Sequence, residues 1–212
     1  MRAAETLHHA LSLAVRVDDH FSGRPWPRAL TVALDSQEPP LRTADGASPR
    51  HADGTYRFVA VKPGVRTVTV TPPDDSFTWT PTATVDLATH DRRQPLVIEV
   101  WPGPDASFAP GTLVLRGRLV GAVAPGLEVR VEVVGAPPRN RRTRADATGE
   151  FVFPVLGMVE LTADQRVELA VTVPTRTVAS IQILDGDTDP VTAGSHVTVQ
   201  PGRATRARLT LT

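Results

Sequence analysis

The segment DGTYRFVAVKPGVRTVTV, residues 53–70, carries the pattern that decides the fold. Tyr56 and Phe58 alternate with polar residues, and Val68 and Val70 do the same after the turn formers at 63–64. Side chains of a β-strand point alternately to its two faces, so apolar residues at every second position indicate a strand with one buried face. The segment therefore predicts two short strands joined by a turn.

The same alternation recurs along most of the chain. It predicts further strands around residues 13–17, 30–34, 96–100, 113–119, 129–133, 151–153, 167–173, 181–183, 197–199 and 207–211. Nearly all of the 20 Pro and 15 Gly fall between these runs and leave little room for a helix, which could form only over residues 3–11. Many short strands without the helical segments of a βαβ unit predict an all-β fold of antiparallel β-sandwiches.

The chain length of 212 residues is close to twice that of a small sandwich. The alternation lapses where Pro and Gly cluster at 102–104 and again at 110–111. We therefore expect an N-terminal segment over 1–10, a first β-sandwich over 11–101, a Pro/Gly linker over 102–111 and a second β-sandwich over 112–212.

The composition narrows the classes of partner and location. Basic and acidic residues number 23 each, so no net field attracts nucleic acid. The chain has no Cys, which excludes disulfides and thiol chemistry. No apolar run is long enough to insert into a membrane, and no signal peptide pattern is visible, so we expect a cytoplasmic protein, or one carried in a released particle, and an extracellular one if a leader is missing. A single lysine, Lys62, among the 23 basic residues is typical of a GC-rich bacterial source.

The two halves of the chain resemble each other around one motif. A glycine turn and an aromatic strand occur at 53–58 and again at 148–153. Residues 53–70 and 144–153 resemble the carboxypeptidase regulatory-like family of Ig-like or transthyretin-like, seven-stranded antiparallel sandwiches, in two tandem copies. The second copy departs after Phe153, where residues 156–158 replace the Pro-Gly turn. The resemblance implies non-catalytic domains that serve stability, adhesion or assembly.

Four arginines, Arg139, Arg141, Arg142 and Arg144, form the strongest local concentration of charge. Guanidinium groups bind carboxylates and phosphates through paired hydrogen bonds, so this segment is a candidate partner-binding loop. The alternative interpretation is a solvated hairpin tip.

Two further groups of residues are candidate ligand sites. Trp26 and Trp79 could form a stacking platform for a sugar or a peptide, although aromatic residues in a small sandwich more often fill its core. Asp185, Asp187 and Asp189 alternate like the start of a calcium loop, but Pro190 and His196 occupy the positions of the glycine and the glutamate of an EF-hand, which leaves only a looser calcium site. The six histidines are scattered, and we expect no metal and no cofactor.

No nucleophile elbow, phosphate loop or metalloprotease helix occurs, so we expect no enzyme and no catalytic residue. The leading hypothesis is a structural, protein-interaction protein, an accessory or scaffold subunit of a larger bacterial assembly such as a phage-tail-like contractile injection particle. Its partners would be proteins, with no small-molecule ligand. The alternative is a surface adhesin or carbohydrate-binding module.

Overall fold

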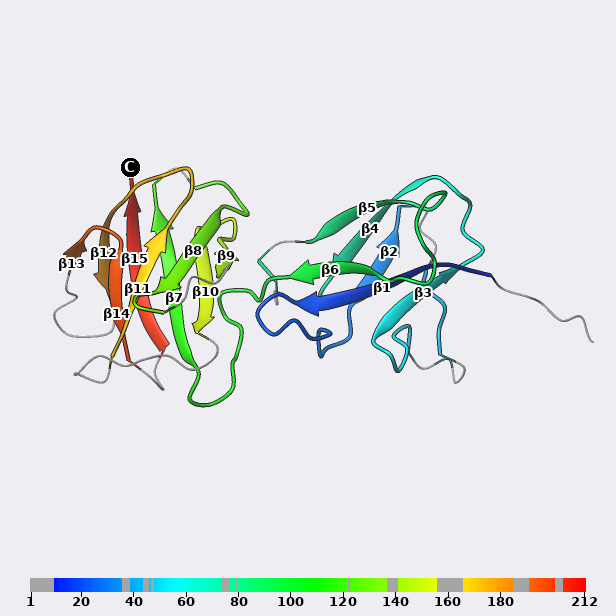
Figure 1. Ribbon diagram of the computed structural model, residues 1–212, viewed down its shortest axis with the longest axis horizontal. Helices are drawn as coiled ribbons and strands as arrows, with labels where there is room; N and C mark the ends of the chain where they lie inside the picture. Colours follow the sequence, from blue (N-terminus) through cyan, green and yellow to red (C-terminus); the bar gives the residue numbers. More distant parts are fainter. Residues whose placement is uncertain are drawn as a thin grey trace, which may run out of the picture. The chain divides into compact units, whose positions relative to one another are not determined.

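The computed structural model describes residues 10–35, 39–43, 46, 48–73, 77–78, 80–121, 123–136, 141–155, 166–184, 191–200 and 204–212. Within these ranges all fifteen elements are β-strands, and they belong to two compact units (Figure 1). The first unit comprises Met1–Asp74 with Thr80–Val100, and the second comprises Asp75–Trp79 with Trp101–Thr212. The fold is therefore all-β, with two sandwiches in tandem, as the alternation predicts.

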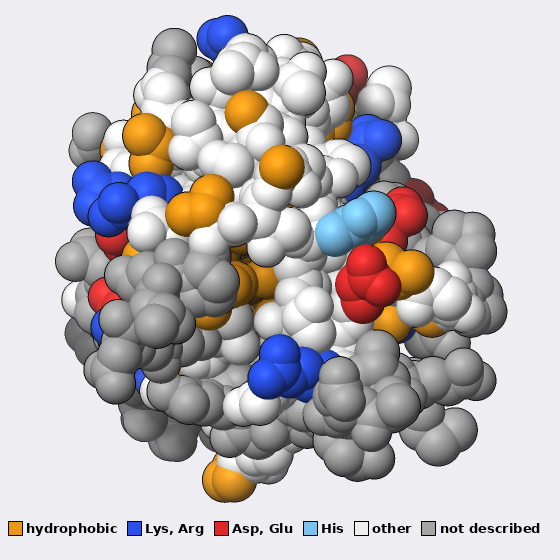
Figure 2. All heavy atoms as spheres, turned by 90° about the vertical axis from the view of Figure 1, so that its left-hand side faces the viewer, with side chains coloured by type: hydrophobic (Ala, Val, Ile, Leu, Met, Phe, Trp, Pro, Cys, Tyr) orange, Lys and Arg blue, Asp and Glu red, His pale blue; other side chains and the backbone are white. Residues whose placement is uncertain are grey.

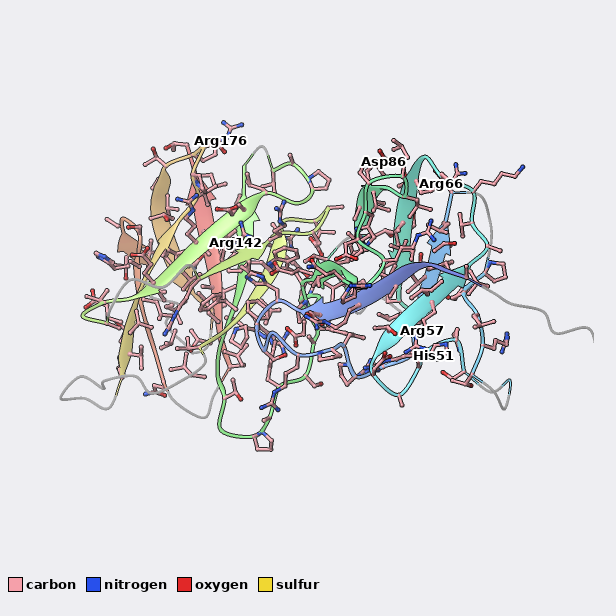
Figure 3. All side chains as sticks on the ribbon, turned by 45° about the vertical axis from the view of Figure 1, so that its right-hand side comes forward. His51, Arg57, Arg66, Asp86, Arg142 and Arg176 are labelled. Atoms are coloured by element: carbon pink, nitrogen blue, oxygen red, sulfur yellow. The ribbon has the colours of Figure 1, made fainter. Side chains whose placement is uncertain are left out.

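The first unit consists of two three-stranded sheets. One sheet has the order β3-β1-β6, and the other has the order β2-β4-β5. The strands are β1 (Leu11–Asp19), β2 (Thr31–Leu34), β3 (Thr55–Val59), β4 (Val65–Thr71), β5 (Thr82–Asp86) and β6 (Leu96–Val100). Arg66 and Asp86, labelled in Figure 3, come from the neighbouring strands β4 and β5.

Alternating side chains of both sheets form the core of the first unit. Leu13, Val15 and Val17 of β1 are buried, as are the rings of Tyr56 and Phe58 of β3. The Tyr56 hydroxyl accepts a hydrogen bond from the Leu30 amide at 3.2 Å, which satisfies a polar group in the core. Burial raises the pKa of this phenol.

The second unit pairs a five-stranded sheet, β10-β7-β15-β12-β13, with a four-stranded sheet, β14-β11-β8-β9. Its strands are β7 (Leu113–Val120), β8 (Glu128–Val133), β9 (Arg142–Arg144), β10 (Glu150–Val155), β11 (Val167–Thr172), β12 (Val178–Ile183), β13 (Val191–Ala193), β14 (His196–Val199) and β15 (Ala204–Leu211). Phe151 and Phe153 are buried at 0% and 2% exposure. The buried Thr143 hydroxyl of β9 donates to the Val152 carbonyl of β10 at 2.8 Å, so the two sheets are joined at this side.

The two units repeat one topology. In each, the first strand lies between an antiparallel neighbour, β3 or β10, and a parallel neighbour that is the final long strand, β6 or β15. The second sheet begins with β2-β4-β5 in the first unit and with β8-β11-β14 in the second. The second unit adds β9 at the edge of its four-stranded sheet, and it adds β12 and the edge strand β13 beyond β15 in its five-stranded sheet. The repeat seen in the sequence thus extends to the order and direction of the strands.

The structure departs from the sequence expectations in three respects. Each unit has one parallel pair, because its first and last strands run in the same direction. The expected linker begins within the second unit, where Trp101, Pro102 and Gly103 are buried and Pro102 forms a bridge to Phe77. Of the segment expected to form a short helix, residues 3–9 lie outside the described residues and Leu11 begins β1.

Candidate functional site

The two turns that precede the aromatic strands have the same construction. Asp53 Oδ1 accepts hydrogen bonds from the Thr55 amide at 3.1 Å and the Thr55 hydroxyl at 2.6 Å. Asp146 Oδ1 accepts the corresponding pair from the amide and hydroxyl of Thr148, both at 2.8 Å. Gly54 and Gly149 have positive φ values of 81° and 83°, a backbone conformation that is strained for residues with a side chain. The shared motif therefore stabilises a turn in both units.

The arginine-rich segment enters the second unit as strand β9, an edge strand paired with β8 (Figure 1). The Arg142 and Arg144 guanidinium groups lie 5.8 and 5.2 Å from the centre of the Trp101 ring. Trp101 is 7% exposed, so two cations cover a nearly buried indole. Such a contact combines packing with the attraction of a cation to a ring face.

Glu128 of β8 provides the negative charge beside these arginines. Its carboxylate accepts a hydrogen bond from Arg130 Nε at 2.8 Å and lies 3.8 Å from Arg142 Nη1. The hydrogen bond from Arg130 lowers the pKa of Glu128; burial opposes this change, and the charges of Arg130, Arg142 and Arg144 add to it. A carboxylate with a lowered pKa stays ionised and offsets part of the positive charge of β9.

These contacts assign a structural role to two of the four arginines in the predicted loop. Arg142 and Arg144 are half-buried strand residues that cover Trp101, and neither lies at a solvated hairpin tip. Arg141 is also half-buried, whereas Arg139 lies outside the described residues. The docking role of the four arginines stays a prediction, which substitutions of Arg139 and Arg141 test most directly.

The other predicted sites meet different outcomes. Trp26 is 8% exposed and belongs to the core of the first unit, so its ring offers no open face for stacking a ligand. This burial corrects the platform hypothesis for Trp26, while Trp79 lies outside the described residues. The calcium candidates Asp185, Asp187 and Asp189 also lie outside them.

The described histidines form separate contacts. His20 Nδ1 lies 3.0 Å from a carboxylate oxygen of Glu99, and His196 Nδ1 lies 3.9 Å from one of Glu168. Within the described ranges, no three His, Asp or Glu side chains are grouped to hold a metal. The same ranges include no helix with the length and apolar character needed to cross a membrane.

The sequence analysis missed a group of arginines on the five-stranded sheet. Arg116 and Arg118 of β7 are paired in register with Arg206 and Arg208 of β15. Their signal is the repeated spacing Arg-x-Arg in two strands, which places each pair on one face. The sequence does not reveal that the two strands are neighbours.

Hydrophobic side chains are dispersed on the face of the molecule shown in Figure 2. They stand mostly in small patches among charged side chains, polar side chains and backbone. Val191 of β13 is the most exposed of the large hydrophobic residues described, at 65%. Isolated exposed residues of this kind are normal on a protein surface.

Comparisons with known proteins give no family for this chain. No family model matches it, and no curated protein matches it. Among solved structures, it is similar to GBS52, the minor pilin of the Gram-positive pathogen Streptococcus agalactiae, with 10% identity, a TM-score of 0.29 and coverage of 94% of this chain and 95% of that one. It is also similar to the major pilin T3.2 from Streptococcus pyogenes serotype GAS13637, with 11% identity, a TM-score of 0.23 and coverage of 94% and 96%. At these TM-scores, neither likeness carries an argument about what this chain does.

Proposed function

We propose that this chain is a non-catalytic structural and protein-interaction protein, an accessory or scaffold subunit of a larger bacterial assembly. The observation that carries the proposal is the repetition of one sandwich topology in two units with filled cores. A repeated, well-packed module is a rigid element that presents sheet edges and faces to other proteins.

The closest ion pairs between the described side chains support this role. On β1, Arg16 forms an ion pair with Asp18. Two further ion pairs join Arg57 with Asp53 at the turn before β3, and Arg130 with Glu128 on β8. Each pair joins residues two or four positions apart and fixes a strand or a turn. These ion pairs therefore stabilise the strands and turns of the two sandwiches.

We also propose that both units belong with the carboxypeptidase regulatory-like sandwiches that the sequence resembles. The support is the shared turn, with an aspartate that accepts from a threonine, a glycine at positive φ and two buried aromatic rings in the strand that follows. Domains of this kind are consistent with a scaffold role, and a phage-tail-like contractile injection particle is the specific assembly that we propose.

The test is purification of the native complex. A chromosomally tagged full chain should elute in a particle far larger than its 22.7 kDa monomer, with the same partners identified by mass spectrometry in repeated purifications. A monodisperse monomer without a partner in cross-linked cells would contradict the proposal. A tail-sheath or tail-tube protein among the partners would support the contractile particle.

The arginine segment offers a sharper test of partner docking. Substituting glutamine for Arg139 and Arg141 leaves the cover of Trp101 in place, because that contact belongs to Arg142 and Arg144. We expect the double variant to remain folded and to lose partner binding. The matched pair Arg142→Gln and Arg144→Gln should instead lower the melting temperature. Full partner binding by the first variant would exclude these two arginines from the interface.

A further inference from the structure

The arginines on the five-stranded sheet form two like-charged pairs. Arg118 lies opposite Arg208, and Arg116 lies opposite Arg206, in the parallel pairing of β7 with β15. Neighbouring strands are about 4.8 Å apart, so paired side chains emerge close together on one face. Like charges in such positions repel and are destabilising, unless an anion lies between them.

One of these two pairs lines a pocket with a volume of about 520 Å³. Arg118 and Arg208 line it, together with Val120 at the end of β7 and Thr148 in the turn before β10. Both arginines are exposed, and neither has a hydrogen-bond or ion-pair partner among the described residues. Two guanidinium groups therefore have donors available to a molecule in the pocket.

The first unit contains the counterpart of Arg118. Arg16 of β1 pairs with Thr55, the residue after Gly54, just as Arg118 pairs with Glu150, the residue after Gly149. Arg16 has its own carboxylate, because Asp18 follows two positions later on the same face. Arg16 Nε lies 3.0 Å from both oxygens of Asp18, and Nη2 lies 2.8 Å from Oδ2.

The second unit lacks this carboxylate. Val120 stands where Asp18 stands in the first unit, and Arg208 stands where Val97 stands on the parallel strand. Glu150 is the acidic residue across from Arg118, but no ion pair joins the two. The repeat thus removes an internal carboxylate and adds a second arginine at the same place.

We propose that the pocket lined by Arg118 and Arg208 binds a carboxylate group, which replaces the internal partner that Arg16 has in Asp18. Two guanidinium forks hold a carboxylate through charge-assisted hydrogen bonds. The carboxylate belongs either to an acidic side chain of a peptide or to a small organic acid, since both offer the same oxygens. The site goes beyond the proposed scaffold function and does not depend on it, because it is a property of the full chain alone.

The experiment is an NMR titration of the ¹⁵N-labelled full chain at low ionic strength, where screening is weak. The probes are succinate, an acetylated and amidated tetra-glutamate peptide, and inorganic phosphate. We expect one or both carboxylate probes to shift the resonances of residues 118–121, 147–149 and 208 in a saturable way. The probe that binds identifies the source of the carboxylate.

Three variants locate the site. Arg118→Gln and Arg208→Gln should each weaken binding about tenfold or more. Val120→Asp should abolish binding although both arginines remain, because it supplies the carboxylate that Asp18 supplies in the first unit. Arg176→Gln, at an exposed arginine in another turn of the second unit (Figure 3), should leave binding unchanged.

Each remaining outcome would overturn the proposal. These outcomes are the absence of saturable shifts with both carboxylate probes, binding of phosphate alone, and binding that survives both Arg118→Gln and Val120→Asp. Val120 is 39% exposed, so an aspartate there should fold. Unchanged resonances far from the pocket in each variant would verify that the second unit is intact.

Discussion

Asp53 Oδ1 accepts hydrogen bonds from the amide and the hydroxyl of Thr55, while Oδ2 accepts one from Arg57 at 2.7 Å. The hydrogen bond from the Thr55 hydroxyl, with help from Arg57, lowers the pKa of Asp53 to about 2 against the opposing effect of burial. A carboxyl group whose pKa is lower in the folded state stabilises that state above its unfolded pKa near 4. That stabilisation is lost as the pH falls from about 4 to about 2.

We therefore expect Asp53→Asn to flatten the acid limb of the stability profile of the first unit. At neutral pH the variant should lose no more than about 1 kcal/mol, because the Asp53–Arg57 pair is exposed to solvent. The loss should shrink between about pH 4 and pH 2, where the wild-type carboxylate takes up a proton. Urea unfolding of both proteins from pH 6 to pH 2 measures this difference, and parallel profiles would contradict it.

Pairs of residues could be predicted from the sequence where they lie close together in one strand. Arg16 and Asp18 share a face by simple alternation, so their contact follows from the predicted strand. The contact of Arg142 and Arg144 with Trp101 does not, because the ring lies far away in the sequence. The pairing of Arg118 with Arg208 was hidden for the same reason, since it depends on which strands are neighbours.

Gly117 and Phe151 show how one pair fixes a strand in its sheet. They face each other across β7 and β10, and the Phe151 ring occupies the space that a Cβ atom at position 117 would need. Gly117→Ala should therefore displace the ring and destabilise the second unit by about 1–3 kcal/mol in chemical denaturation. In the Phe151→Leu background, the same substitution should cost less, because the smaller side chain leaves space. Equal costs in both backgrounds would show that the ring is not the obstacle.

The strands that could be predicted have large apolar residues at alternate positions, and the strands that were missed do not. β1, β3, β8 and β15 each have a buried row of Leu, Val, Ala or aromatic side chains. β5, β9 and β13 are short and rich in Thr, Arg or Ala, and they lie at sheet edges. Edge strands bury fewer side chains, so their residues carry a weaker periodic signal.

The tandem organisation could be predicted from the repeated turn, but the parallel pairing in each unit could not. Alternation defines the faces of a strand and carries no information on the direction of its neighbour. Parallel strands need a long connection, and here the whole of each module lies between the first strand and the last. Although both units pair their first and last strands in parallel, the two copies differ in the residues that these strands present at the surface. In the first unit β1 carries an internal ion pair, whereas in the second unit β7 and β15 bring two pairs of arginines together.

Phe77 lies between β4 and β5 of the first unit in sequence, yet it belongs to the second unit, where it forms a bridge to Pro102 and is 8% exposed. The next residue donates its amide to the Trp101 carbonyl at 3.2 Å. Phe77→Ala should therefore remove core packing from the second unit and lower its unfolding free energy by about 3–5 kcal/mol. Calorimetry of the full chain should show one lowered transition, and Phe58→Ala, in the core of the first unit, should lower the other. If both variants lowered the same transition, Phe77 would not belong to the core of the second unit.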